Sequence, residues 1–183
     1  MAGARRCLYE KGYARTTARD IATAAGVSLA AIGYHFGTKD TLLNVALREA
    51  IEQWGEEVGR VLAQGAEPGA DPADRFARTW TRVVESFADS AQLWAVQFEL
   101  LAHLQRVPEL RAEFTASTRA ARLALAELFG TPTPDEEAAL QVGALYQALL
   151  AGLAAQWLGD PTDLPGGDEL LTAIRHIARS LSP

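Results

Sequence analysis

The sequence predicts an all-α protein with a small three-helix domain at its N-terminus and a larger helical bundle behind it. Three observations support this prediction. Apolar residues recur at steps of three and four along every long segment, glycine and proline gather between those segments, and no segment alternates with the two-residue period of a β-strand. The 183 residues, 49% of them hydrophobic and 22% charged, are enough to bury a substantial core.

The charge of the chain is divided unevenly along its length. The net charge is −6, but residues 1–50 hold seven Lys and Arg against four Asp and Glu, which gives +3. The remainder holds ten against nineteen, which gives −9. A protein with a basic N-terminal portion and an acidic remainder can approach phosphates with one end only.

The single cysteine, Cys7, excludes an internal disulfide and a cysteine-cluster metal site. One cysteine is also typical of proteins in the reducing cytoplasm. Residues 1–13 contain no apolar run of the kind that a secretory signal needs, so we expect a cytoplasmic protein.

The first helix is predicted over residues 2–11, where Ala4 and Leu8 are expected to pack on Ile21 and Phe36 and close a three-helix domain. The two adjacent arginines of this helix either reach phosphate or are solvated surface charge.

The second helix is predicted to begin after Thr17, a suitable N-cap, with Asp20 three residues further on to complete a capping box. Gly26 permits the left-handed backbone of a turn, and Val27 is expected to fill the corner. Ser28 is placed to cap the third helix.

The third helix is predicted over residues 28–36, with Ile32 and Phe36 on one apolar face. The opposite face has no evident core role and consists of Leu29, Ala30, Gly33 and Tyr34. Two short helices joined by a glycine turn are typical of the helix-turn-helix, whose second helix enters the DNA major groove, although ordinary helical bundles contain the same pattern.

The segment GYARTTARDIATAAGVSLAAIGYHFGTKDTLL resembles the DNA-binding segment of the tetracycline-repressor (TetR) family of bacterial transcription regulators. The resemblance covers roughly Leu8 to Leu47 and includes the GY before the first Thr, IA-x-x-AGVS, the terminal YHF and K-x-x-LL. It implies a DNA-binding domain over residues 1–47 and an effector-binding and dimerisation domain over residues 48–183. It also implies a homodimer that binds a palindromic double-stranded operator.

Position by position, the resemblance implies DNA contacts at Thr17, Arg19, Leu29, Ala30, Ala31, Gly33, Tyr34, His35 and Lys39. Lys39 is the best phosphate candidate, because its ammonium lies beside the free amides at the start of a helix. His35 either bonds phosphate or closes the end of its helix. Many family members have an aromatic residue where this chain has Gly33. Because Leu29, Ala30 and Ala31 stand in place of long polar side chains, direct hydrogen-bond readout is expected to be sparse, with thymine methyl contacts and DNA shape contributing.

The rest of the chain is predicted to consist of further helices. Thr38 opens a long helix whose apolar stripe is Leu43, Leu47, Ile51, Trp54, Val58 and Val61. Helices are also expected over residues 76–87, 93–104 and 109–129, with loops at 64–72 and 130–134.

Residues 138–158 carry no charge over a length that could span a membrane. Three glutamines and acidic flanks argue against insertion, so we expect a helix buried on both sides and no membrane partner. The last two helices, about 135–159 and 167–181, are predicted to form the homodimer contact; the alternative is that they serve only the core of one protomer.

The resemblance further implies a repressor that a small effector releases from DNA, with activation as the less common direction in such families. Residues that could line the effector site are Trp80, Trp94, Phe98, His103, Phe114 and Tyr146. Each of them has a plain core or surface role as its alternative. This set favours a hydrophobic or aromatic effector.

The sequence indicates neither an enzyme nor a cofactor. The three histidines lack metal-ligand spacing, and no G-x-S-x-G or phosphate-binding glycine motif is present. A helical small-molecule-binding enzyme and a protein-interaction module without DNA binding are the alternative interpretations.

Overall fold

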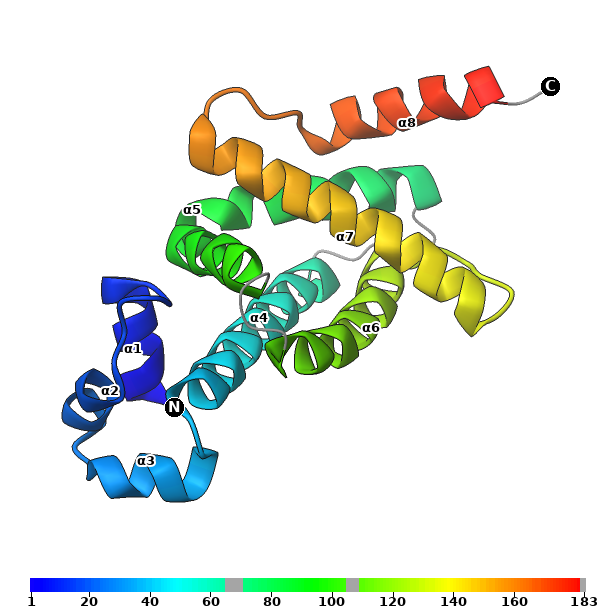
Figure 1. The fold of residues 1–183 in the computed structure, drawn as a ribbon. Coiled ribbons are helices and arrows are strands. Elements are labelled where there is room, and N and C mark those ends of the chain that lie inside the picture. The colour runs from blue at the N-terminus through cyan, green and yellow to red at the C-terminus, as the bar shows by residue number, and fades with distance from the viewer. Residues whose placement is uncertain (65–70, 105–108, 182–183) are drawn as a thin grey trace. The chain divides into compact units, whose positions relative to one another are not determined.

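The protein is all-α. The computed structural model describes residues 1–64, 71–104 and 109–181, with the side chains of residues 103–104 and 109–116 outside that description. No strand occurs in the described part of the chain. Its helices are α1 (Ala2–Lys11), α2 (Ala18–Ala25), α3 (Leu29–Phe36), α4 (Lys39–Gln64), α5 (Pro72–Leu104), α6 (Glu109–Phe129), α7 (Glu136–Gly159) and α8 (Gly167–Leu181) (Figure 1).

The chain forms two compact units. Unit 1 consists of Met1–Gly55 and Ser90–Ser117, and unit 2 consists of Glu56–Asp89 and Thr118–Pro183. The boundaries between the units therefore fall inside α4, α5 and α6 rather than in loops.

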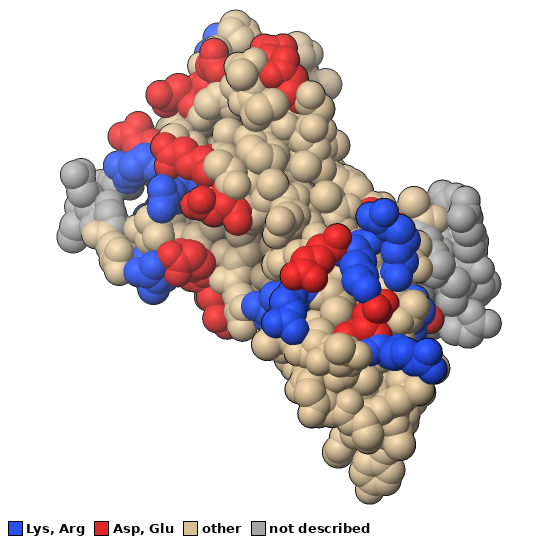
Figure 2. All heavy atoms as spheres, turned by 90° about the vertical axis from the view of Figure 1, so that its left-hand side faces the viewer, with Lys and Arg blue, Asp and Glu red and all other residues tan. Residues whose placement is uncertain are grey.

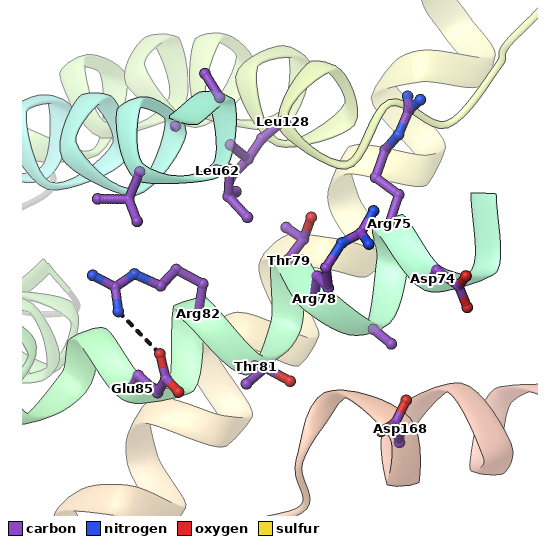
Figure 3. Close-up of a pocket in the computed structure, with 14 residues that line it drawn as sticks. Leu62, Asp74, Arg75, Arg78, Thr79, Thr81, Arg82, Glu85, Leu128 and Asp168 are labelled. Atoms are coloured by element: carbon purple, nitrogen blue, oxygen red, sulfur yellow. Dashed lines mark hydrogen bonds and ion pairs between the residues drawn. The ribbon is translucent and has the colours of Figure 1, made fainter. Parts of the chain in front are cut away.

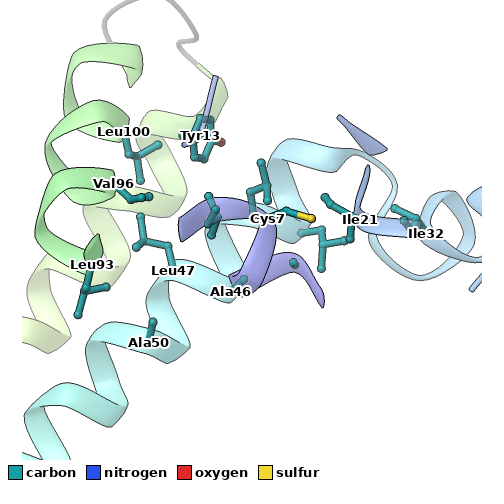
Figure 4. Close-up of a cluster of buried hydrophobic side chains, with 14 of the residues drawn as sticks. Cys7, Tyr13, Ile21, Ile32, Ala46, Leu47, Ala50, Leu93, Val96 and Leu100 are labelled. Carbon is teal, nitrogen blue, oxygen red and sulfur yellow. The ribbon is translucent and has the colours of Figure 1, made fainter. Parts of the chain in front are cut away.

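The core of unit 1 joins the first three helices to α4 and to the second half of α5. Leu8 is fully buried and Ile21 is 2% exposed, and Ala4 and Phe36 belong to the same cluster, as the sequence predicts. Figure 4 shows the α5 side chains that complete this cluster, which are Leu93, Val96 and Leu100. Residues about 50 to 90 positions apart in the sequence thus share one core.

Helix α5 is kinked at Ser90, and its two halves correspond to the two helices that the sequence predicts over residues 76–87 and 93–104. Ser90 alone departs from helical geometry, with φ −118° and ψ 17°. The irregular residue lies at the boundary between the units, where Asp89 ends one segment and Ser90 begins the next.

The core of unit 2 contains a cluster of four aromatic rings from three helices. Phe129 and Tyr146 are stacked with ring centroids 4.1 Å apart, and Trp80 lies 4.8 Å from Phe129. Phe76 lies 5.9 Å from the Phe129 ring. The Tyr146 hydroxyl is hydrogen-bonded to the Thr131 hydroxyl at 2.5 Å, so its polar end is also satisfied.

Helix α7 crosses α6 at a close backbone contact. A Cβ atom on Gly143 would lie 2.0 Å from the backbone oxygen of Arg122, so only glycine fits there. Helix α7 is the one described helix long and apolar enough to cross a membrane, and a core helix of a soluble protein passes the same test. The sequence predicts that α7 is buried on both sides. Within a single copy of the chain it is buried on one side only, since Leu145 is 59% exposed.

Helix α8 begins at the predicted residue and leaves its apolar face increasingly uncovered. Leu170 is buried near its start, whereas Ile177 is 59% and Leu181 is 78% exposed. Most of the loop predicted at residues 64–72 lies outside the residues that the structure describes.

Candidate nucleic-acid interface

The start of α2 is capped as the sequence predicts. The Thr17 hydroxyl accepts a hydrogen bond from the Asp20 amide, and the Asp20 carboxylate accepts one from the Thr17 amide at 2.9 Å. Lys11 donates to the same carboxylate at 2.6 Å. The hydrogen bonds that this carboxylate accepts, from Lys11 foremost and then from the Thr17 hydroxyl and amide, hold the pKa of the Asp20 carboxyl well below its usual range. The start of α2 therefore has a defined orientation on α1.

The turn between α2 and α3 depends on Gly26, which adopts the left-handed conformation with φ 67°. The Val27 amide then donates to the Ala22 carbonyl at 3.0 Å. The prediction that the Val27 side chain fills the corner is wrong, since that side chain is 47% exposed. Backbone hydrogen bonds close the turn instead. The Ser28 hydroxyl caps α3 by accepting from the Ala31 amide at 3.1 Å.

Helix α3 presents one face to solvent. Ile32 is 5% exposed and anchors the helix, whereas Tyr34 is 86% and Leu29 is 50% exposed. Ala30, Gly33 and His35 are exposed as well, and Ala31 is half-buried. A Cβ atom on Gly33 would meet no atom within 4 Å. This face is small and neutral, and its most prominent side chain is Tyr34.

Basic side chains lie near α3 but not on it. Figure 2 shows Lys and Arg side chains above the lower tip, which is formed by α3 and carries no Lys, Arg, Asp or Glu. Lys39, in the first turn of α4, lies over the Tyr13 ring at 5.6 Å and 3.3 Å from the Asp40 carboxylate. Arg19 is exposed on α2.

The two arginines of α1 have partners inside unit 1. Arg5 donates to the Gln53 side chain at 2.5 Å, and Arg6 donates to the Ala24 carbonyl at 2.7 Å. Both side chains therefore help to hold α1 against its neighbours. This favours a structural role over the two predicted roles, phosphate contact and solvated surface charge.

One residue that positions this surface has no signal in the sequence. Glu99, in the second half of α5, accepts hydrogen bonds from the Tyr13 and Ala14 amides, both at 2.8 Å. A Cβ atom on Gly12 would lie 2.5 Å from the same carboxylate. Glu99 thus ties the segment between α1 and α2 to α5, across more than 80 positions of sequence.

The structure brings together only some of the six residues predicted for the effector site. Trp80 and Tyr146 lie in the aromatic cluster of unit 2, with centroids 6.4 Å apart. Trp94 and Phe98 belong to unit 1, where Trp94 packs edge-to-face on Trp54 at 5.1 Å. The side chains of the other two predicted residues, His103 and Phe114, lie outside the described part.

A pocket of about 670 Å³ lies in unit 2 and is lined by none of these six residues (Figure 3). It is bounded by the end of α4, the first half of α5, Leu128 of α6 and Asp168 of α8. Three arginines of α5 line it, namely Arg75, Arg78 and Arg82.

A capped pair of short helices with an exposed face on the second is typical of a helix-turn-helix protein. Comparison with known families agrees with this class. Residues 1–46 match the model of the bacterial regulatory proteins of the tetR family, and residues 71–180 match the tetracyclin repressor-like C-terminal domain. The chain therefore belongs to the TetR family of transcriptional regulators.

Curated relatives agree with this assignment. The HTH-type transcriptional regulator BetI of Stenotrophomonas maltophilia is 32% identical over 115 residues, which are 56% of this chain and 55% of that protein. The match thus spans about half the length of BetI. The HTH-type transcriptional regulator TtgR of Pseudomonas putida is 29% identical over 91% of this chain and 82% of its own.

Solved structures share the fold over nearly the whole chain. A transcriptional regulator from Rhodococcus sp. Rha1 superposes with a TM-score of 0.63 at 23% identity, covering 100% of this chain and 96% of that one. A TetR-like transcriptional regulator from the same organism gives 0.54 at 15% identity, covering 99% and 93%.

Proposed function

We propose that this chain is a transcriptional repressor that binds double-stranded DNA by placing α3 in the major groove. The observation that carries this proposal is the exposed, neutral face of α3 on a helix whose opposite side is anchored by Ile32. A helix-turn-helix protein reads bases through such a face.

The DNA contacts in this proposal divide into two groups. Lys39, Thr17 and Arg19 supply phosphate contacts, which set affinity and orientation. The face of α3 reads the groove, and its members are Leu29, Ala30, Ala31, Gly33, Tyr34 and His35. Because these side chains offer few hydrogen bonds, apolar contact with thymine methyl groups and DNA shape carry more of the sequence preference. The DNA-binding domain in this proposal is residues 1–47.

The partners in this proposal are a second copy of the chain and a palindromic operator. Two copies present two α3 helices to successive major grooves, about 34–36 Å apart. The exposed apolar residues of α7 and α8 support a dimer contact through these helices.

An effector enters the proposal as a hydrophobic or aromatic small molecule bound by residues 48–183 that favours a state unable to bind DNA. The six residues named from the sequence remain its predicted site. We infer that the chain acts in the cytoplasm, without a membrane partner and without catalytic activity of its own, since its relatives are named as regulators.

The test is a DNA-binding titration on the segment upstream of the coding region, located by footprinting. Lys39→Ala is expected to weaken binding to specific and nonspecific DNA alike and to reduce the salt slope by about 1, because one phosphate contact is lost. Ala30→Gln should instead change the preference among sequences. Arg119→Ala, which removes an exposed arginine of unit 2, serves as the charge-matched control. If Lys39→Ala binds both kinds of DNA as well as the wild type does, the proposed docking is wrong.

A further inference from the structure

The arginines of the unit 2 pocket lie on one side of a single helix. Arg75, Arg78 and Arg82 are spaced by three and four residues along α5, so they share a face. Figure 3 shows all three reaching from α5 toward the side where Leu62 and Leu128 lie. Their cationic ends and these apolar side chains therefore border the same space.

Two of the three arginines have no ionic partner in the described part of the chain. Arg82 pairs with Glu85 on its own helix at 3.0 Å. Neither Arg75 nor Arg78 occurs among the ion pairs of the described residues. The Arg75 guanidinium lies against Gly130, where a Cβ atom would be 2.7 Å from Nη1. Two guanidinium groups are thus available to an incoming anion.

The carboxylates that also line the pocket lie elsewhere. Asp168 reaches in from α8, on the other side of α5 from Leu62 and Leu128, and Asp74 points away from the arginines (Figure 3). Glu85 is already paired with Arg82. The pocket therefore has an acidic side and a separate side that is both cationic and apolar.

We propose that this pocket binds a small amphipathic carboxylate. The carboxylate group pairs with the guanidinium groups of Arg75 and Arg78, and the hydrocarbon part packs on Val61, Leu62 and Leu128. Guanidinium is suited to this role because its planar donors match both oxygens of a carboxylate. A volume of about 670 Å³ lies within the range of small-molecule sites.

The proposed carboxylate site is distinct from the six residues predicted to line the effector site, none of which lines this pocket. Trp80 and Tyr146 pack among other aromatic rings, whereas the pocket combines charge with apolar surface. Occupation of the pocket is a property of the free protein, so its test needs no DNA.

Three probes of one chain length and different charge test the proposal by calorimetry on the full chain. Octanoate carries the proposed charge, 1-octanol is neutral, and octylammonium would prefer the acidic side. Octanoate should bind at least about tenfold more tightly than either counterpart, as expected for a hydrogen-bonded ion pair. Butanoate should bind more weakly than octanoate, because it buries less hydrocarbon.

Substitutions then assign the site. Arg75→Gln and Arg78→Gln should each weaken octanoate binding about tenfold or more and leave the affinity for 1-octanol unchanged. Both arginines are exposed, so the variants should fold, and circular dichroism verifies this. Arg119→Gln is the matched control, because Arg119 is an exposed arginine of unit 2 that does not line the pocket.

Three results would overturn the proposal. They are the absence of octanoate binding, equal or tighter binding of 1-octanol or octylammonium, and octanoate affinities of the Arg75 and Arg78 variants that equal that of the Arg119 variant. None of these results bears on DNA binding, which is measured separately with Lys39→Ala.

Discussion

At the scale of single residues, the candidate DNA-binding surface depends on two carboxylates with different ranges of action. Asp20 acts within its own helix start and on the neighbouring Lys11. Glu99 acts on a segment that is distant in sequence. The first was predictable from the spacing of Thr17 and Asp20, since a capping box involves residues three apart. The second was not, because no local pattern marks a carboxylate that accepts hydrogen bonds from a remote turn.

The Asp20 capping box should make stability depend on pH. The pKa of Asp20 is lower in the folded than in the unfolded chain, so its stabilising effect is complete above the unfolded pKa of about 4 and declines as pH falls further. Asp20→Asn should therefore lower the free energy of unfolding at neutral pH, and the difference from the wild type should shrink in acid.

Urea unfolding at a series of pH values measures this difference. Asp163→Asn, at an exposed aspartate in unit 2, should match the wild type throughout. A deficit of Asp20→Asn that stays constant between neutral pH and about pH 3 would contradict the assigned role of the carboxylate.

Glu99 should contribute to stability by satisfying two backbone amides. Glu99→Ala removes both acceptors and is expected to lower the free energy of unfolding by about 1–3 kcal/mol. Glu99→Gln keeps one acceptor oxygen and should cost less. Glu10→Ala, at an exposed glutamate of α1, is the matched control and should cost little. Equal unfolding midpoints for the Glu99→Ala and Glu10→Ala variants would show that these hydrogen bonds do not contribute to the free energy of unfolding.

At the scale of elements, the helical periodicity predicted where the helices lie. The helix predicted over residues 167–181 has the same bounds as α8. The helix predicted over residues 135–159 corresponds to α7, which begins one residue later, at Glu136. The two helices predicted over residues 76–87 and 93–104 correspond to the halves of α5 on either side of its kink at Ser90. The apolar periodicity did not predict how the helices cross. The close backbone contact between Gly143 of α7 and Arg122 of α6 is an example.

Gly143 should be intolerant of any side chain. Its Cβ would lie 2.0 Å from the Arg122 oxygen, so Gly143→Ala must move α7 away from α6. We expect a loss of about 1–3 kcal/mol in the free energy of unfolding, as for other overpacked sites.

Gly55→Ala provides the comparison for this substitution. A Cβ on Gly55 in α4 would meet nothing within 4 Å, so alanine should stabilise that helix by roughly 0.5–1 kcal/mol. Chemical denaturation at one protein concentration measures both variants. If Gly143→Ala proved as stable as Gly55→Ala, the close crossing of α6 and α7 would be wrong.

At the scale of the whole molecule, the apolar surface left on α7 and α8 is the feature that one chain does not explain. Ile177→Asp with Leu181→Asp places charge on the most exposed apolar residues of α8. If α8 forms the dimer contact, this double variant should be monomeric at concentrations where the wild type is dimeric, since burying unpaired charge is costly.

Sedimentation equilibrium measures the oligomeric state. Arg175→Asp with Arg179→Asp, at two exposed arginines of the same helix, is the control for added acidic charge. A double variant Ile177→Asp and Leu181→Asp that dimerises like the wild type would place the contact elsewhere. If the chain binds a palindromic operator as proposed, DNA affinity should fall together with dimerisation, because one DNA-binding domain on a single half-site binds more weakly than two linked domains.

The sequence by itself determined the features that depend on residues within about four positions of one another: the caps of α2 and α3, the glycine turn and the apolar stripes of the helices. Tertiary structure decided the features that depend on packing between distant segments. These are the contact of Glu99 with the Tyr13 and Ala14 amides, the crossing at Gly143, and the grouping of residues 90–117 with residues 1–55. The physical reason is that hydrogen bonds within a turn are set by local spacing, whereas contacts between helices depend on which faces meet in space.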